Sequence, residues 1–360
     1  MKIASILGAR PQFIKAATVS RVITRTPKFQ EVLIHTGQHF DPNMSDIFFE
    51  GLGIPKPDHH LGIGGGSHGQ NTGRMIEGVE RVLEREKPDW VLVYGDTDST
   101  LAGALAAVKL HIPIAHVEAG LRSFNRKMPE EINRILTDHA ASLLFAPTTA
   151  AVENLEREGI SGERVVAVGD VMYDATLFYK NRARPPSVMS SIEGEAFVVC
   201  TIHRAENTDS PVRLREIIVM LNDLSEQVSV VLPLHPRTLM ALKRTMDCAL
   251  NPRIKVIQPV GFLEMVWMLD HCHMVITDSG GLQKEAYFHR KKCITLREET
   301  EWIETVQVGA NQLCPPSEGL SALVLAEYAN SAASEVMFSD SLLYGDGTAS
   351  EKIVKTLGNC

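Results

Sequence analysis

The chain has 360 residues, of which 44% are hydrophobic and 22% charged, an ordinary balance for a globular enzyme. Its net charge of −8 disfavours a nucleic-acid or anionic-membrane partner, and no apolar run approaches the roughly 18 residues of a membrane-spanning helix. At roughly 100–200 residues per domain, the length predicts two domains. All six cysteines lie in the second half without a CxxC pair, which favours a reducing, cytoplasmic location over a disulfide framework.

Short apolar runs alternate with longer helical patterns, which is typical of βαβ units around a parallel sheet. In the first half we expect strands at residues 3–7, 31–35, 90–94, 114–117, 143–146 and 165–168, and helices at 72–86, 100–110 and 130–141. A polar, proline-bearing stretch at 180–194 is the predicted linker. Further strands are expected at 196–201, 228–233, 254–257, 274–277 and 293–296. The pattern predicts an α/β protein with two doubly wound halves and a site in the cleft between them.

One segment of the first half could hold a phosphate. Gly8-Ala9-Arg10-Pro11 follows the first predicted strand and precedes a helix that contains Lys15. A helix start beside an arginine is a ready anion site, although a plain surface turn is the alternative. The glycine-rich segment 62–69 has no recognisable strand before it, so we expect a loop there rather than a phosphate cradle.

Acidic residues follow two neighbouring predicted strands. Asp96 comes after strand 90–94 and Glu118 after strand 114–117, so both carboxylates are expected to face one crevice. Glu130, at the start of the next helix, is a third candidate. Several carboxylates in one cleft raise at least one pKa, which suits proton transfer near neutrality. The alternative is that Glu130 is only a helix-start acid paired with Arg134.

The second half offers histidines and glycines at strand ends. His203 and His235 each follow a predicted strand, and Ser279-Gly280-Gly281 lies between a strand and a helix, where backbone amides can hold a phosphate. Glu285 is placed to accept hydrogen bonds from ribose hydroxyls. A single such histidine is more often a packed side chain, but three polar strand ends together favour a nucleotide-diphosphate site. No histidine or cysteine spacing predicts a metal site.

These motifs resemble the non-hydrolysing UDP-N-acetylglucosamine 2-epimerase family. The matching segments are Gly8-Ala9-Arg10-Pro11, Gly95-Asp96, His116-Val117-Glu118-Ala119-Gly120-Leu121-Arg122, Pro129-Glu130-Glu131-Ile132-Asn133-Arg134, His203-Arg204-x-Glu206-Asn207 and Asp278-Ser279-Gly280-Gly281-x-Gln283. The resemblance implies a glycosyltransferase-B-like fold with two Rossmann-like domains, residues 1–180 with 342–360 and residues 181–341, and a returning helix at 350–357. It also implies a homodimer, a UDP-sugar substrate and no metal or nicotinamide cofactor.

The resemblance further implies a reaction in which UDP is eliminated to give a glycal and then re-added with inversion at C2 of the sugar. The implied acid–base residues are Asp96, Glu118 and Glu130, with His203 assisting the departing phosphate. The implied substrate-binding residues are Arg10, Lys15, Arg134, His235, Phe262, Ser279, Gly280, Gly281 and Glu285. Of these, Phe262 would pack near uracil.

Two segments depart from the family pattern. Trp302 stands where the family often has an arginine that could touch substrate, and the segment at 38–46 differs from the one that binds an activating sugar nucleotide in regulated members, so we expect no such activation. The whole pattern looks like the branch that acts on UDP-2,3-diacetamido-2,3-dideoxy-glucuronate for surface polysaccharide. A uronate needs a cation, and Arg126 or Lys127 could supply it, unless both belong to a solvated basic loop.

Four alternatives remain open from the sequence. The first is a UDP-N-acetylglucosamine 2-epimerase, and the second is a retaining glycosyltransferase of the same fold. An acidic chain without a basic or apolar membrane-facing segment argues against a lipid-acceptor transferase. A hydrolysing epimerase usually carries a fused kinase domain, and a nucleotide-sugar sensor would not need three acids.

Overall fold

The computed structural model describes residues 1–38, 49, 52–192, 194–234, 236–244, 249–330 and 342–360. The chain forms two compact units, one of Met1–Ala175 with Leu342–Cys360 and the other of Thr176–Ser341. The boundary falls inside helix α7 (Val171–Lys180), just before the polar stretch that we expected to be the linker. The stretch itself contains a 3-10 helix at Ser187–Ile192.

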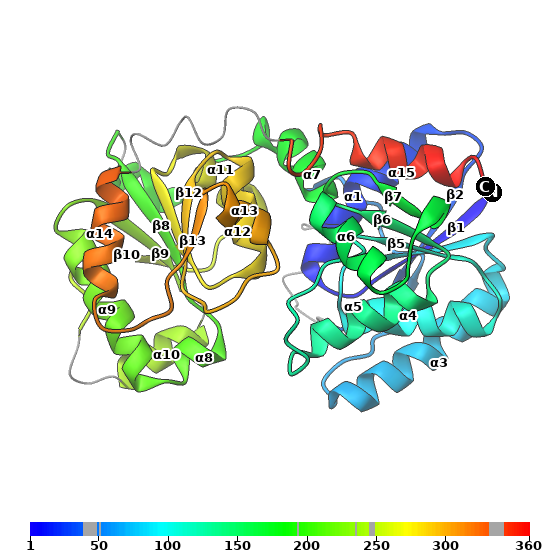
Figure 1. The fold of residues 1–360 in the computed structure, drawn as a ribbon, viewed down its shortest axis with the longest axis horizontal. Helices are drawn as coiled ribbons and strands as arrows, with labels where there is room; N and C mark the ends of the chain where they lie inside the picture. The colour runs from blue at the N-terminus through cyan, green and yellow to red at the C-terminus, as the bar shows by residue number, and fades with distance from the viewer. Residues whose placement is uncertain (39–48, 50–51, 193, 235, 245–248, 331–341) are drawn as a thin grey trace. The chain divides into compact units, whose positions relative to one another are not determined.

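Among its described residues, the first unit is built on a seven-stranded parallel sheet in the order β3-β2-β1-β4-β5-β6-β7. The strands are β1 (Lys2–Leu7), β2 (Gln30–His35), β3 (His59–His60), β4 (Trp90–Tyr94), β5 (Ile114–Val117), β6 (Leu143–Ala146) and β7 (Val165–Ala167). The other helices are α1 (Arg10–Arg25), α3 (His68–Glu86), α4 (Asp98–Lys109), α5 (Pro129–Ala140), α6 (Thr149–Arg157), the 3-10 helix Gly162–Arg164 and α15 (Ala349–Leu357). Helices α1 and α15 cover one face of the sheet, and α3, α4 and α5 cover the other (Figure 1).

In the part of the second unit that the structure describes, six parallel strands follow the order β10-β9-β8-β11-β12-β13. They are β8 (Phe197–Thr201), β9 (Ser229–Pro233), β10 (Lys255–Ile257), β11 (Met274–Thr277), β12 (Lys292–Thr295) and β13 (Asn311–Leu313). The helices are α8 (Ala205–Thr208), α9 (Pro211–Ser225), α10 (Pro236–Arg244), α11 (Phe262–His271), α12 (Gly280–Phe288), α13 (Ile303–Gln307) and α14 (Leu320–Asn330). Helices α9 and α14 pack on one face, and α11 and α12 on the other (Figure 1).

Every strand predicted from an apolar run is present, with ends that differ by at most one residue. The runs are visible because both faces of each sheet are covered, so that all five residues of β4 are buried. Strands β3 and β13 were missed because they are short and largely polar. The expectation for segment 62–69 was partly wrong, since it connects β3 to α3 and its Ser67 accepts a hydrogen bond from Gln70 N at the start of that helix.

The strand orders locate the expected ligand sites. In the first unit β1 lies between β2 and β4, and in the second unit β8 lies between β9 and β11. The connections therefore reverse direction at the β1–β4 pair and at the β8–β11 pair, and ligands of doubly wound sheets bind outside the carboxyl ends of such pairs. We therefore expect the catalytic and ligand-binding residues in the segments that follow these strands and their neighbour β5.

Gly8, which directly follows β1, leaves no room for a side chain. A Cβ atom there would overlap the hydroxyl oxygens of Ser99 and Thr36. We expect Gly8→Ala to lower the free energy of unfolding by about 1–3 kcal/mol. The matched control is Gly73→Ala in α3, where a Cβ meets no atom within 4 Å and should add about 0.5–1 kcal/mol. Urea unfolding of both variants measures the difference, and equal stabilities would contradict the close packing at Gly8.

Candidate active site

Two carboxylates of the first unit emerge from adjacent strands. Asp96 follows β4 and Glu118 follows β5, and the last residues of these strands, Tyr94 and Val117, are paired. Glu118 has a φ of 73°, a left-handed conformation that is uncommon for a residue with a side chain and tends to persist at functional sites. Its Oε2 lies 3.3 Å from the position that a Cβ would take at Gly95, so the carboxylate covers the turn that carries Asp96.

Each of these carboxylates contacts a cation. Lys15 of α1 forms an ion pair with Glu118, in which both side chains are largely buried. Arg134 of α5 donates from Nε and Nη2 to Asp96 Oδ2, at 3.0 and 2.6 Å. The structure therefore brings together four of the residues that the sequence predicted for this site, and the two cations fix the directions in which the two acids point.

The two consecutive glutamates that begin α5 have different surroundings. Glu130 is exposed, and no hydrogen bond or ion pair of its side chain is found among the described residues. Glu131 is buried and accepts hydrogen bonds from Ser123 N, Phe124 N and Arg134 Nη1, at 2.9, 2.9 and 2.7 Å. Burial opposes ionisation of Glu131, but these donors outweigh it and lower its pKa. The alternative in which Glu130 pairs with Arg134 is therefore wrong, because Arg134 is held by Glu131 and Asp96.

The expected anion site at the start of α1 needs a correction. The amides of Gly8 and Ala9 both donate to Gln12 Oε1, at 2.8 and 2.9 Å. Gln12 Nε2 in turn donates to Tyr94 O at 2.8 Å, so this side chain ties the end of β1 to the end of β4. The two amides are occupied by the protein itself and do not await a phosphate. Arg10 is the first residue of α1 and is half-buried.

In the second unit, His203 and Asp278 meet across the β8–β11 pair. Asp278 is fully buried and accepts hydrogen bonds from His203 N, Arg204 N and Asn207 Nδ2 at 3.0–3.1 Å. Its Oδ1 lies 2.9 Å from His203 Nδ1, and although burial opposes ionisation, these donors lower the pKa of Asp278. An ionised Asp278 accepts the Nδ1 proton, which directs Nε2 of the half-exposed His203 away from it.

A cradle with two arginines and one glutamate forms at the start of α12. Ser279 is the N-cap residue, and Gly280 and Gly281 open the helix, where the first amides have no partner within the helix. Around the position of a Cβ at Gly280 lie Glu301 Oε2, at 3.7 Å, and Arg204 Nη2 and Arg297 Nη1, each at 3.8 Å. Arg297 is buried and pairs with Glu301, at 3.1 Å. Helix-start amides beside arginines suit a phosphate group.

The sequence profile of the family described as UDP-N-acetylglucosamine 2-epimerase matches residues 21–358. The UDP-2,3-diacetamido-2,3-dideoxy-D-glucuronate 2-epimerase of Pseudomonas aeruginosa is 54% identical to this chain over 360 residues, which cover 99% of each sequence. The chain belongs to the UDP-N-acetylglucosamine 2-epimerase family. This membership makes it an isomerase that acts as a UDP-sugar 2-epimerase, and it confirms the resemblance inferred from the motifs.

Two further relatives agree with this membership. The UDP-N-acetylglucosamine 2-epimerase of Methanococcus maripaludis is 48% identical over 325 residues, 87% of each sequence. The crystal structure of Methanocaldococcus jannaschii UDP-GlcNAc 2-epimerase in complex with UDP-GlcNAc and UDP matches with a TM-score of 0.85 and 41% identity, over the full length of both chains. The predicted α/β class, glycosyltransferase-B-like with two Rossmann-like domains, is confirmed. Among the described helices, none is long and apolar enough to span a bilayer.

The other predicted site residues of this epimerase have less defined surroundings. Glu285 is half-buried in α12, and its Oε1 lies 3.6 Å from the position of a Cβ at Gly281. Phe262 begins α11 and packs edge-on against Tyr179, with ring centroids 5.3 Å apart. His235 lies outside the described residues, as does most of the segment expected to lack the activating nucleotide site.

Trp302 has a different place from the one that the family pattern suggested. It is 5% exposed, and its indole Nε1 donates to Gly280 O at 2.8 Å. The ammonium group of Lys284 lies over the ring, 4.2 Å from its centroid. The Trp302 side chain therefore packs at the start of α12 and holds the Gly280 carbonyl in place. An arginine at this position was instead expected to touch substrate. The sequence identified Trp302 as a departure but gave no sign of this packing.

We expect Trp302→Phe to weaken UDP binding, because it removes the hydrogen bond to Gly280 and keeps an aromatic ring beneath Lys284. A net hydrogen bond of about 0.5–1.5 kcal/mol corresponds to a roughly 2–10-fold higher Kd for UDP. Isothermal titration calorimetry measures the change. Trp267→Phe, in α11 beside the amino end of β8, is the matched control, and an equal Kd in both variants would contradict the supporting role of Trp302.

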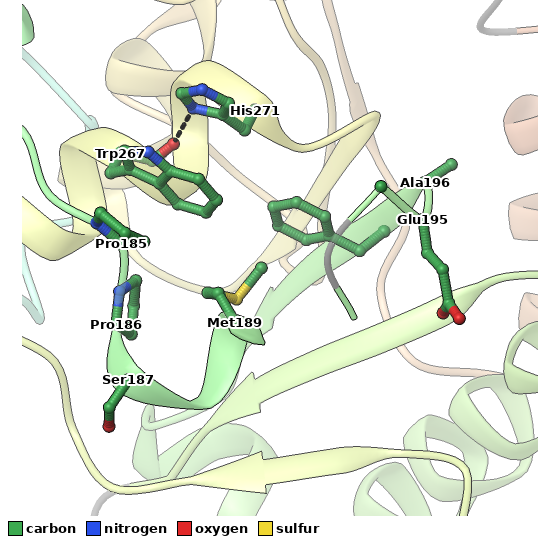
Figure 2. Close-up of a pocket in the computed structure, with 10 residues that line it drawn as sticks. Pro185, Pro186, Ser187, Met189, Glu195, Ala196, Trp267 and His271 are labelled. Atoms are coloured by element: carbon green, nitrogen blue, oxygen red, sulfur yellow. Dashed lines mark hydrogen bonds between the residues drawn. The ribbon is translucent and has the colours of Figure 1, made fainter. Parts of the chain in front are cut away.

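Trp267 lines a separate cavity of the second unit (Figure 2). Its ring stacks on His271, with centroids 4.1 Å apart, and its carbonyl oxygen accepts a hydrogen bond from His271 Nδ1 at 2.8 Å. The cavity also contacts Met189 and Phe197, and Phe197 is the first residue of β8. It therefore lies at the amino end of the strand whose carboxyl end precedes His203. None of the predicted site residues that the structure describes lines it.

Proposed function

We propose that this epimerase interconverts UDP-2,3-diacetamido-2,3-dideoxy-D-glucuronate and its manno isomer by inversion at C2. The observation that carries the proposal is the 54% identity, over 99% of both sequences, to the Pseudomonas aeruginosa enzyme of that name. UDP-N-acetylglucosamine is the second candidate substrate. It is favoured by the 48% identical Methanococcus maripaludis enzyme and by the Methanocaldococcus jannaschii complex.

The proposed reaction runs through elimination, because the C2 proton of a 2-acetamido sugar is not acidic enough for simple removal and return. A base takes the C2 proton while the bond between C1 and the β-phosphate oxygen breaks, and the electrons form a C1–C2 double bond. UDP then re-adds to C1 through the same phosphate group while an acid delivers a proton to the opposite face of C2. The steps balance without a metal, nicotinamide or other co-reactant.

The first unit supplies the proposed proton transfers. Asp96, Glu118 and Glu130 are the acid–base groups, and proton transfer by a positioned side chain contributes about 10²–10⁴-fold to a rate. Lys15 and Arg134 hold two of these acids in place. Glu130 has the exposed carboxylate without a partner among the described residues, which supports its direct contact with substrate. Three acids also favour an epimerase over a transferase of the same fold.

The second unit holds the proposed leaving group. His203 stabilises or protonates the departing phosphate, and the amides of Gly280 and Gly281 bind the diphosphate together with Arg204. The helix start and the two arginines around Gly280 support this assignment. The amide of Ser279, which was also predicted to bind the diphosphate, already donates to Thr277 Oγ1 at 2.9 Å. Further proposed contacts are Glu285 with ribose, Phe262 with uracil, and Arg10 and His235 with the diphosphate.

The carboxylate of a uronate substrate requires a cation. Arg126 and Lys127 are both exposed, in the loop that leads from β5 to α5. Glu131 accepts hydrogen bonds from Ser123 N and Phe124 N, which join this loop to the first turn of α5, where Glu130 also lies. We propose that one of the two basic side chains binds the carboxylate, and the alternative remains a solvated basic loop.

We further propose that the epimerase is a cytoplasmic homodimer that serves the synthesis of a surface polysaccharide such as lipopolysaccharide. The cysteine distribution supports a reducing compartment. Members of the UDP-N-acetylglucosamine 2-epimerase family are typically homodimers. Light scattering coupled to size-exclusion chromatography tests the dimer, which predicts about twice the chain mass of 39.6 kDa.

Positional isotope exchange tests the elimination step. Substrate labelled with ¹⁸O in the oxygen between C1 and the β-phosphate should lose the label to non-bridging phosphate positions, because the free β-phosphate rotates before re-addition. The exchange should need the enzyme and no acceptor sugar. A retaining transferase would show release of UDP that depends on an acceptor, and absence of both exchange and epimerised product would refute the proposed reaction.

A further inference from the structure

His116 lies in β5, two residues before Glu118, and has no role in the reaction described above. Its side chain is fully buried. Nε2 lies 2.7 Å from Gly95 O, and Nδ1 lies 2.6 Å from Asp138 Oδ1 on α5. The ring therefore links Gly95, which lies between β4 and Asp96, to α5, the helix that carries Arg134.

The chemistry of the two partners determines the protons on the ring. A peptide carbonyl can only accept a hydrogen bond, so Nε2 must carry a hydrogen. Asp138 Oδ2 accepts from Gly120 N at 3.1 Å and forms an ion pair with Arg122 Nη1 at 2.8 Å, so this carboxylate acts as an acceptor on both oxygens. Burial opposes its ionisation, but the charged guanidinium of Arg122 and the donating amide of Gly120 favour the carboxylate, and the pKa of Asp138 is lowered. An ionised Asp138 requires a hydrogen on Nδ1 as well.

The charged groups that surround the ring compensate a cation at this position. Arg122, buried in the loop that follows β5, pairs with both Asp138 and Glu158, the latter at 2.7 Å. An imidazolium at His116 would therefore make two positive groups, with Arg122, opposite the two carboxylates of Asp138 and Glu158. His139 of α5 lies further out, with its Nε2 3.5 Å from Glu158, and is half-exposed.

We propose that His116 is a buried imidazolium that acts as a positioning residue for the acid–base site. Its Nε2–H group holds the Gly95 carbonyl and so fixes the turn that presents Asp96, while its Nδ1–H group is anchored by Asp138. Glu118 Oε2 lies 3.3 Å from the position of a Cβ at Gly95, so a shift of the Gly95 peptide would change the position of Asp96 relative to Glu118. A misplacement of about 1 Å at a reacting group can cost about 100-fold in rate.

Nitrogen NMR of the wild-type enzyme tests the protonation directly. With ¹⁵N-labelled histidine, the ring signals missing from His116→Asn identify His116. Both nitrogens should have the shifts of protonated imidazolium nitrogens near neutral pH. One nitrogen at the far-downfield shift of an unprotonated ring would overturn the proposal. This measurement does not depend on the proposed epimerase activity.

Steady-state kinetics and UDP binding of His116→Asn test the positioning role, which rests on the proposed function. We expect kcat to fall roughly 10–100-fold, with the Kd for UDP unchanged within about twofold, because His116 and the UDP-binding cradle belong to different units. His271→Asn is the matched control and should keep the wild-type kcat. An unchanged kcat in His116→Asn, or parallel losses of kcat and UDP affinity, would overturn the positioning role even if the NMR result stands.

Discussion

Replacing Glu130 by glutamine is expected to lower kcat by about 10²–10⁴-fold while leaving Tm unchanged. The amide cannot exchange a proton with C2 of the sugar, and the side chain that it replaces is exposed and has no partner among the described residues. Initial rates of epimerisation and thermal unfolding measure the two effects separately. A variant with wild-type kcat would remove Glu130 from the acid–base groups.

Glu131→Gln is the matched control one residue further along α5. Its carboxylate is buried and accepts four hydrogen bonds, from Ser123 N, Ser123 Oγ, Phe124 N and Arg134 Nη1. Glutamine can satisfy only some of these donors, so we expect the free energy of unfolding to fall by about 1–3 kcal/mol. The Glu130→Gln and Glu131→Gln variants therefore distinguish an effect on kcat from an effect on stability at adjacent positions. Equal losses of stability in both variants would contradict the different surroundings of the two glutamates.

His203→Asn is expected to lower kcat by about 10²–10⁴-fold with the Kd for UDP changed only a few-fold. The reason is that asparagine keeps a polar group near Asp278 but has no ring nitrogen to direct towards the departing phosphate. Single-turnover measurement of the exchange of bridging ¹⁸O, which follows cleavage of the C1–oxygen bond, together with calorimetry of UDP binding, distinguishes slow chemistry from weak binding.

Arg204→Gln provides the contrast to His203→Asn. Arg204 reaches Gly280 with its guanidinium group, so its loss should weaken UDP binding. A charge-assisted hydrogen bond of about 1.5–3 kcal/mol corresponds to a roughly 10–100-fold higher Kd. If His203→Asn weakened UDP binding as strongly as Arg204→Gln and left kcat unchanged, His203 would be a binding group and not an assistant of the leaving group.

The sequence predicted the sheets and the paired acids well, for a physical reason. Strands covered on both faces are continuous apolar runs, so the residues that follow them, Asp96 and Glu118, could be assigned to one edge of the sheet. Strand β3 could not be predicted because its two histidines carry no apolar pattern. Because β3 was not predicted, the glycine-rich segment could not be recognised as the connection between a strand and α3.

The sequence could not predict which side chains form hydrogen bonds and ion pairs with one another. Local spacing suggested that Arg134 pairs with Glu130. In the structure Arg134 instead donates to Asp96, a residue 38 positions away, and to Glu131. In the same way, Gln12 occupies amides that looked available for a phosphate. Asp278 and Arg204 stood in motifs that we noted, yet their contacts with His203 and Gly280 depend on segments about 75 residues apart.

The most direct test of the proposed function is proton NMR in D₂O, with the enzyme given UDP-N-acetylglucosamine and UDP-2,3-diacetamido-2,3-dideoxy-D-glucuronate in separate samples. We expect a manno-type anomeric signal with deuterium at C2 in the uronate sample alone. Turnover of UDP-N-acetylglucosamine alone would assign the second candidate substrate. Absence of deuterium at C2 in both samples would contradict epimerisation by proton transfer at C2.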